Sequence, residues 1–258
     1  MKKIKINTDF KSKTILTDFI QDIPNRFEKE GKVIYDERNT IRVFKINGFP
    51  LIVKRFKQPL FVQRLVYSFF RPTKVIRAYK HAHELRKRGI ETPQEIACIE
   101  VWKNGLFKDG YLVTEITYDQ PIANILTQKA QSFSKSFIKQ FASFLANLHK
   151  KGILHHDLNS TNVLYREEQE NYFFSLIDIN RMKIYPNGTT PPKEYCLENM
   201  TRFTKDYNVF KIVLQAYAEK RGWNIQETIK KATKIKELHD IRRAKRKAFF
   251  YYFKKKKQ

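Results

Sequence analysis

The feature that most constrains this chain is a polar segment, HHDLNSTN at His155–Asn162, which lies between two apolar runs. It places Asp157 and Asn162 five residues apart, and a further aspartate, Asp178, ends the apolar run Phe174–Ile177. Aspartate and asparagine are common in turns, so a polar turn between a helix and a hairpin would explain each residue alone. The full spacing, with apolar residues on both sides, instead favours a chemical role for all three.

An aspartate, an asparagine and a second aspartate in this order are the groups that phosphoryl transfer from ATP requires. Asp157 would accept the proton of the attacking hydroxyl, while Asn162 and Asp178 would coordinate the Mg²⁺ that bridges the phosphates. Lys54 ends the apolar run Leu51–Val53 and would neutralise the α- and β-phosphates. A solvated lysine at a strand end explains Lys54 alone equally well, but its order with the other residues favours the phosphate role.

Two acidic residues complete the candidate set. A glutamate on the following helix usually pairs with such a lysine, and Glu84 is the only acid between Lys54 and Arg88. Glu84 is therefore the candidate partner by elimination, although a solvated glutamate on a helix would look the same. Glu115 follows the apolar residues of Leu112–Thr114 and is expected, from its position alone, to offer backbone groups to adenine at the hinge between two lobes.

The first third of the chain predicts a β-rich lobe. The strands are expected at Val33–Tyr35, Thr40–Ile46, Phe49–Phe56, Glu95–Trp102 and Tyr111–Ile116. The dipeptide Asn47-Gly48 between two of them is a strong hairpin signal, because both turn positions need a positive φ. A helix is expected over Val75–Arg88, and the pairs Asn104-Gly105 and Asp109-Gly110 are interpreted as turns.

The rest of the chain predicts a mainly helical lobe. Apolar residues recur at helical spacing over Ser134–His149, a strand pair is expected at Asn162–Tyr165 and Tyr172–Ile177, and helices follow from Leu197. The order predicts an α+β, two-lobed protein-kinase-like fold. We expect a nucleotide-binding lobe at residues 1–117 and a catalytic lobe at residues 118–258, which ends in a basic tail at residues 242–258.

Net charge is the unusual feature of the composition. The 258 residues include 51 Lys and Arg against 26 Asp and Glu, a net charge of +25 that attracts polyanions. The cysteines, Cys98 and Cys196, are expected to be reduced and buried, because two are too few for a disulfide scaffold. No apolar segment predicts a signal peptide or a membrane span, so we expect a cytoplasmic protein.

The chain resembles the lipopolysaccharide kinase (Kdo/WaaP) family of bacteria, a kinase-like group that phosphorylates inner-core sugars. The resemblance covers roughly Gly31–Arg221 and is carried by Lys74–Tyr79, Gly89–Pro93, His156–Asn162 and Ile177–Arg181. The chain departs from protein kinases in lacking a glycine-rich phosphate loop, where Asp36–Asn39 stands instead, and in replacing the glycine of D-F-G with Asn180. Near Lys80, where the family often has a helix glutamate, this chain has lysine.

The resemblance implies ATP and Mg²⁺ as cofactors and a Kdo or heptose hydroxyl on the lipid A-linked core as acceptor. It also implies an anionic glycolipid partner, with peripheral contact of the protein on an anionic inner membrane. The segment Arg242–Lys257 supports this contact, because it holds nine Lys or Arg, no acid and the aromatic run Phe249–Phe253. A frayed, solvated tail or aromatic packing on the helical lobe would explain it too. Residues 57–74 have a similar composition, and core packing explains their aromatic residues equally well.

Two other functions are compatible with the sequence. One is a kinase for another small molecule, such as an aminoglycoside, or for protein; the basic excess argues against a cationic acceptor. The other is a non-catalytic basic module that binds nucleic acid or membrane, since phosphate contacts alone give salt-dependent affinity. Nucleic acid is the weaker partner, because no recognised nucleic-acid-binding motif is present.

Overall fold

The computed structural model describes residues 1–37, 39–56, 61–126 and 134–255, without the side chains of residues 61 and 250–255. The chain divides into two compact units: unit 1 holds Met1–Tyr118 and Ser175–Arg181, and unit 2 holds Asp119–Phe174 and the chain after Arg181. The predicted α+β class is confirmed, with an antiparallel sheet in unit 1 and a mainly helical unit 2. The predicted lobe boundary after residue 117 stays a prediction.

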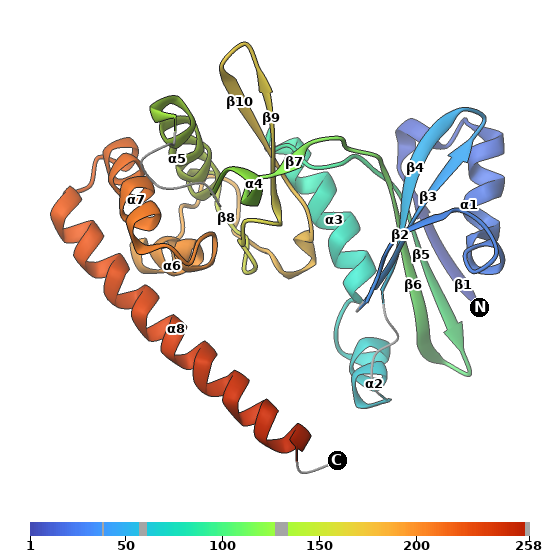
Figure 1. The fold of residues 1–258 in the computed structure, drawn as a ribbon. Helices are drawn as coiled ribbons and strands as arrows, with labels where there is room; N and C mark the ends of the chain where they lie inside the picture. Colours follow the sequence, from blue (N-terminus) through green and yellow to red (C-terminus); the bar gives the residue numbers. More distant parts are fainter. Residues whose placement is uncertain (38, 57–60, 127–133, 256–258) are drawn as a thin grey trace. The chain divides into compact units, whose positions relative to one another are not determined.

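The centre of unit 1 is a six-stranded sheet with the order β1-β5-β6-β4-β3-β2 (Figure 1). Its strands are β1 (Lys2–Ile6), β2 (Lys32–Asp36), β3 (Asn39–Ile46), β4 (Phe49–Phe56), β5 (Glu95–Lys103) and β6 (Leu106–Glu115). The predicted hairpin is present, because Asn47 and Gly48 both have positive φ (48° and 81°) and join β3 to β4. This pairing fixes Lys54 near the end of β4, opposite Ile41 on β3 and Leu112 on β6.

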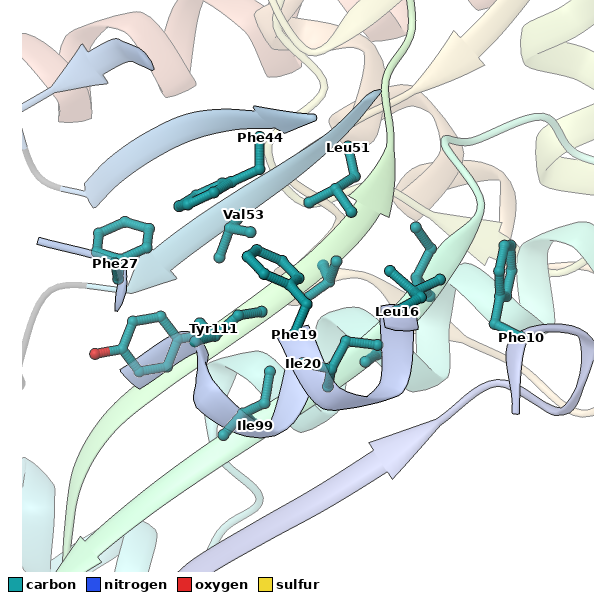
Figure 2. Packing of buried hydrophobic residues seen from close by; sticks show 14 residues of the cluster. Phe10, Leu16, Phe19, Ile20, Phe27, Phe44, Leu51, Val53, Ile99 and Tyr111 are labelled. Atoms are coloured by element: carbon teal, nitrogen blue, oxygen red, sulfur yellow. The ribbon is translucent and has the colours of Figure 1, made fainter. Parts of the chain in front are cut away.

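Helix α1 (Thr14–Arg26), preceded by the short 3-10 helix η1 (Thr8–Phe10), covers one face of the sheet. Its residues Leu16, Phe19, Ile20 and Ile23 recur at helical spacing and are buried. The Phe19 ring packs against Phe44 of β3, with 5.1 Å between the ring centroids. Figure 2 shows side chains of α1 meeting those of the strands in this layer. This cluster includes Leu51 and Val53 of β4, so it supports the strand that carries Lys54.

Helix α3 (Lys74–Lys87), predicted from the sequence, packs with a second buried cluster of sheet residues. Cys98 belongs to this cluster, whereas its neighbours Ala97 and Ile99 belong to the α1 cluster, as alternation along a strand requires. Thr73 caps the helix by accepting from the backbone N–H of Ile76. Helix α2 (Phe61–Phe69) precedes α3 and leaves Phe69 exposed.

The predicted turn at Asp109-Gly110 is wrong, since both residues lie inside β6. A Cβ atom at Gly110 would lie 2.8 Å from Cγ1 of Val75 on α3. The glycine therefore permits a close approach of α3 to the sheet rather than a reversal of the chain. The pair Asn104-Gly105 makes the actual turn, with φ of 52° and 74°.

Substitution Gly110→Ala is expected to lower the free energy of unfolding by about 1–3 kcal/mol, because the new methyl group overpacks the contact with Val75. Urea unfolding of the wild type and the variant measures this loss. In a Val75→Ala background the loss caused by Gly110→Ala is expected to shrink, because the clashing methyl groups are gone. An equal loss in both backgrounds would contradict the steric explanation.

Unit 2 is built on helix α5 (Lys135–Lys150), which Ser134 caps and which packs against α7 (Tyr207–Arg221). Its remaining elements are β7 (Gln120–Pro121), α4 (Ala123–Leu126), β8 (Ile153–Leu154), β9 (Val163–Glu168), β10 (Asn171–Leu176, which runs into unit 1), β11 (Lys183–Ile184), α6 (Lys193–Asn199), the 3-10 helix η4 (Met200–Arg202) and α8 (Ile225–Lys255). The predicted helix at Ser134–His149 and the strand pair that follows it are therefore present. The polar segment 155–162 connects β8 to β9.

Helix α8 is anchored by its first half. Lys236 is almost fully buried and donates to the backbone carbonyls of Thr201 (3.0 Å) and Thr204 (2.8 Å), beside an ion pair with Asp240. The predicted basic tail begins within the same helix, and its residues are exposed as far as Phe249. The side chains of Phe250–Phe253 and residues 256–258 lie outside what the structure describes. No helix in the described ranges is long and apolar enough to span a bilayer.

Candidate active site

The loop between β8 and β9 is held by hydrogen bonds within its own length. The side-chain Nδ2 of Asn162 donates to the carbonyl of Asp157 at 2.8 Å. The Oδ1 atom of Asn159 accepts from the backbone N–H groups of Thr161 (2.9 Å) and Asn162 (3.0 Å). Leu158 is fully buried and so anchors the loop in the interior of unit 2. Because Nδ2 of Asn162 is occupied, its remaining polar atom is Oδ1, an acceptor of the kind that binds a hard cation.

The carboxylate of Asp157 has a specific partner, Arg202, from η4. The Arg202 Nη1 atom lies 2.8 Å from Oδ1 of Asp157 and also donates to the carbonyl of His156 at 3.0 Å. The two side chains are 33% and 21% exposed, so the pair is partly shielded from water. Arg202 therefore orients the carboxylate that the sequence predicts as the proton acceptor. Sequence spacing could not have identified Arg202, because it lies 45 positions from Asp157 and meets it only through folding.

A chain of buried hydrogen bonds reaches the start of the same loop. His149 is fully buried, with Nδ1 2.8 Å from the Tyr217 hydroxyl and Nε2 3.1 Å from Oδ1 of Asn199. The Nδ2 atom of Asn199 donates to the carbonyl of His155 at 2.8 Å. Because Oδ1 of Asn199 can only accept, Nε2 of His149 carries the proton and Nδ1 accepts from Tyr217. The chain thus connects α7, α5 and α6 to the loop through a neutral histidine.

Burial lowers the pKa of His149 from 6.5 to about 4, so the folded protein resists protonation of this side chain. The unfolded chain binds this proton more readily than the folded protein does. The folded protein therefore has its full stability above pH 6.5, where His149 is neutral in both states, and loses stability as the pH falls towards 4. The free energy of unfolding is expected to fall by about 3 kcal/mol over this range from His149 alone. Urea unfolding at pH 7 and pH 4 measures the decrease.

The variant His149→Gln is the control, because its side chain does not titrate and can still form hydrogen bonds. Between pH 7 and pH 4 its free energy of unfolding is expected to fall by less than that of the wild type. The difference between the two decreases should be about 3 kcal/mol. Equal changes in the two proteins would show that His149 is not the titrating group.

In unit 1, the structure brings together Lys54 and Asp178, which the sequence predicts separately. The Nζ atom of Lys54 lies 2.9 Å from Oδ1 of Asp178. The Nδ2 atom of Asn180, which stands at the position of the D-F-G glycine, donates to the same oxygen at 2.9 Å. Asp178 has φ of 54°, a left-handed conformation that is uncommon for a residue other than glycine and concentrates at functional sites.

The structure does not bring Glu84 to Lys54. The Glu84 carboxylate pairs with Arg88 one helical turn away, at 2.7 Å, while Lys54 pairs with Asp178. The sequence assigns Asp178 to the metal ion and Glu84 to Lys54, whereas in this structure Asp178 itself pairs with Lys54. The role of Glu84 as partner of Lys54 stays a prediction.

Helix α3 contacts the Asp178 segment through a different residue, His81. Its Nδ1 atom lies 2.7 Å from the carbonyl of Ile179, which can only accept, so Nδ1 carries a proton. Burial lowers the pKa of His81, which keeps the ring neutral at pH 7. We find no sequence signal that would have selected this histidine from the others on the helix.

Glu115 lies at the end of β6, opposite Leu51 of β4. Its backbone N–H donates to the carbonyl of Gln94 at 3.0 Å. This donor is therefore already used within the sheet of unit 1, and the predicted contribution of Glu115 to adenine binding stays a prediction.

Three comparisons with known proteins bear on the site. A family model described as the lipopolysaccharide kinase (Kdo/WaaP) family matches residues 38–204, which include Lys54, the loop 155–162 and Asp178. A solved structure titled "WaaP in complex with acyl carrier protein" has a TM-score of 0.64 and 13% identity, over 94% of this chain and 98% of that one. No curated protein sequence matches the chain.

Proposed function

Because the chain belongs to the lipopolysaccharide kinase (Kdo/WaaP) family, and so is an ATP-dependent phosphotransferase that acts on a sugar hydroxyl, we propose that its acceptor is a Kdo or heptose hydroxyl of the inner core. The family match supports the acceptor. The observation that supports catalysis is the loop 155–162, in which Asn162 donates to the Asp157 backbone carbonyl and Arg202 orients the Asp157 carboxylate. These contacts favour catalysis over a degenerate, purely binding fold.

In the proposed mechanism Asp157 accepts the proton of the sugar hydroxyl as that oxygen attacks the γ-phosphorus of ATP, whose bond to the bridging oxygen breaks to release ADP. Arg202 holds the carboxylate in one orientation, which limits the reorganisation needed in the transition state. Lys54 would neutralise phosphate charge, and its present partner Asp178 would become a metal ligand. When bound, MgATP supplies the phosphoryl group and the cation that balances its charge.

The donor atoms suit Mg²⁺. The predicted ligands, Asn162 and Asp178, offer an amide oxygen and a carboxylate, and Mg²⁺ prefers oxygen ligands. No cluster of three or more His, Cys, Asp or Glu residues in the described part of the chain could form a separate metal cage. This is the pattern expected of a cation that is bound by one or two protein oxygens together with substrate phosphates.

The charge of the chain supports an anionic glycolipid acceptor at the cytoplasmic face of an inner membrane. With a net charge of +25, the protein is attracted to phosphates and carboxylates at such a surface. Helix α8 leaves its basic residues exposed from Arg242 to Lys247, and Phe69 and Phe70 at the end of α2 are 68% and 84% exposed. Basic and aromatic side chains together suit an anionic membrane interface.

An acceptor assay tests the proposal. The protein is incubated with γ-labelled ATP, Mg²⁺ and either Kdo-lipid A or heptosyl-Kdo-lipid A in mixed micelles, with gentamicin and casein as the alternative acceptors. We expect label in one of the two glycolipids, in a Mg²⁺-dependent reaction, and the labelled acceptor identifies the sugar. Label only in gentamicin or casein, or in none of the four acceptors, would overturn the proposal.

A further inference from the structure

Unit 2 has a cavity of about 380 Å³ beside the loop 155–162. Residues from β8, β11, α6, η4 and α8 line it together with His156 of the loop itself. Its basic, acidic and histidine lining residues are His156, Lys183, Glu198, Arg202, His239 and Arg246. The volume falls in the range typical of small-molecule sites. The cavity is therefore large enough for a ligand and lies next to the predicted proton acceptor.

The lining is electropositive. Lys183, Arg202 and Arg246 supply three positive charges to the lining, and Glu198 supplies its one carboxylate. Arg202 also pairs with Asp157, which is not among the lining residues. Among the ion pairs of the described residues none involves Lys183 or Arg246, and the Lys183 ammonium lies over the Tyr185 ring at 4.6 Å. Burial lowers the pKa of His156, and the charges of Lys183 and Arg202 lower it further against the opposing charge of Glu198. These features favour an anionic ligand.

Arg202 connects this cavity to Asp157. Its guanidinium lines the cavity and also lies 2.8 Å from the Asp157 carboxylate, so a group that binds the cavity lies close to the proton acceptor. A guanidinium has five N–H donors, and only Nη1 is used in the contacts with Asp157 and His156. The other donors can serve a carboxylate or a phosphate, the groups that arginine binds best.

We propose that this cavity binds an anionic substituent of the acceptor, a sugar carboxylate or a phosphate monoester, through Lys183, Arg202 and Arg246. The proposal rests on the function proposed above and assigns the recognition of acceptor charge to these three residues. In this arrangement the anion fixes the acceptor, and a neighbouring hydroxyl is presented to Asp157. Acceptors without the anion are then poor substrates because they lose their position rather than their reactive group.

Binding of small probes tests the cavity without any phosphoryl transfer. Isothermal titration calorimetry would use Kdo as the sugar carboxylate, glucosamine 1-phosphate as the phosphate monoester, and glucose as the neutral sugar. The variant Lys183→Gln/Arg246→Gln removes two cavity charges. Lys183 and Arg246 are themselves exposed, so the matched variant Lys234→Gln/Arg243→Gln removes the same charges from two other exposed positions, both on α8 and outside the cavity.

We expect at least one anionic probe to bind the wild type more tightly than glucose does. Its affinity should fall at least tenfold in the cavity variant and less than twofold in the matched variant. The probe whose affinity falls shows whether the cavity recognises a sugar carboxylate or a phosphate monoester. Equal losses in the two variants would show only general attraction to a basic protein and would overturn the proposal, as would binding that neither variant weakens.

Kinetics separate this inference from the proposed function. With Kdo-lipid A or heptosyl-Kdo-lipid A, the cavity variant is expected to raise the KM for the acceptor at least tenfold while the KM for ATP stays within twofold. If no glycolipid is phosphorylated but the probes still depend on Lys183 and Arg246, the anion site stands and the glycolipid acceptor proposed above falls. A cavity variant with unchanged KM for a phosphorylated glycolipid would overturn the role in acceptor recognition.

Discussion

Replacing Asp157 with asparagine is expected to lower kcat for sugar phosphorylation by about 10³-fold, because the variant cannot take the proton from the attacking hydroxyl. The amide keeps an oxygen that can accept from Arg202, so the 2.8 Å contact and the loop around it can persist. The KM for ATP is therefore expected to stay within about twofold of the wild type, since only a transition-state interaction is lost. Initial rates at varied ATP and acceptor concentrations measure both quantities.

The control for this experiment is Asp206→Asn, which makes the same chemical change at the N-cap of α7. Asn caps helices as well as Asp does, so the fold and kcat should be unaffected. If the Asp157→Asn variant were folded by circular dichroism and kept a tenth or more of the wild-type kcat, Asp157 would not be the proton acceptor.

Replacing Asp178 with asparagine is expected to lower kcat by about 10³-fold and to raise the Mg²⁺ concentration needed for half-maximal rate. Catalysis by such sites rests on positioning and on charge stabilisation, and the variant loses a carboxylate at the proposed cation site. It also removes the ion pair between Lys54 and Asp178. Initial rates over a Mg²⁺ titration measure the two changes, and a thermal shift by MgATP reports binding separately.

Asn180→Ala provides a graded comparison. It removes one hydrogen bond to the Asp178 carboxylate, with an N–O distance of 2.9 Å, but leaves the charge and the contact with Lys54. A loss of about tenfold in kcat is expected, the size of one hydrogen bond to a charged group. An Asp178→Asn variant with wild-type Mg²⁺ dependence would rule out Asp178 as a metal ligand, whatever its effect on kcat.

Local patterns predicted the parts of the fold that depend on local chemistry. The Asn47-Gly48 hairpin and the helix at Ser134–His149 follow from turn geometry and apolar spacing, and both are present. Neither α1, whose apolar residues recur at helical spacing, nor β1 was predicted from the sequence. The turn predicted at Gly110 was wrong, because sequence alone does not distinguish a glycine in a turn from a glycine that lets a helix approach a strand closely.

The candidate site was predictable where it depends on spacing and unpredictable where it depends on tertiary contacts. Asp157 and Asn162 come from one loop, so their relation is local. Arg202 and His81 approach the predicted residues only because η4 and α3 fold against them. The Lys54–Asp178 pair joins positions 124 residues apart, and counting acids along the chain selected Glu84 instead.

The buried chain from Tyr217 through His149 and Asn199 to the carbonyl of His155 has an evolutionary consequence. A single replacement at any of its three side chains leaves a buried polar partner without its hydrogen bond, which lowers the free energy of unfolding by about 1–3 kcal/mol. The most accessible mutational route therefore replaces these positions together, or passes through intermediates that are less stable. Among relatives of this chain, residues 149, 199 and 217 should be inherited as a correlated set, while the exposed basic positions of α8 can drift one at a time.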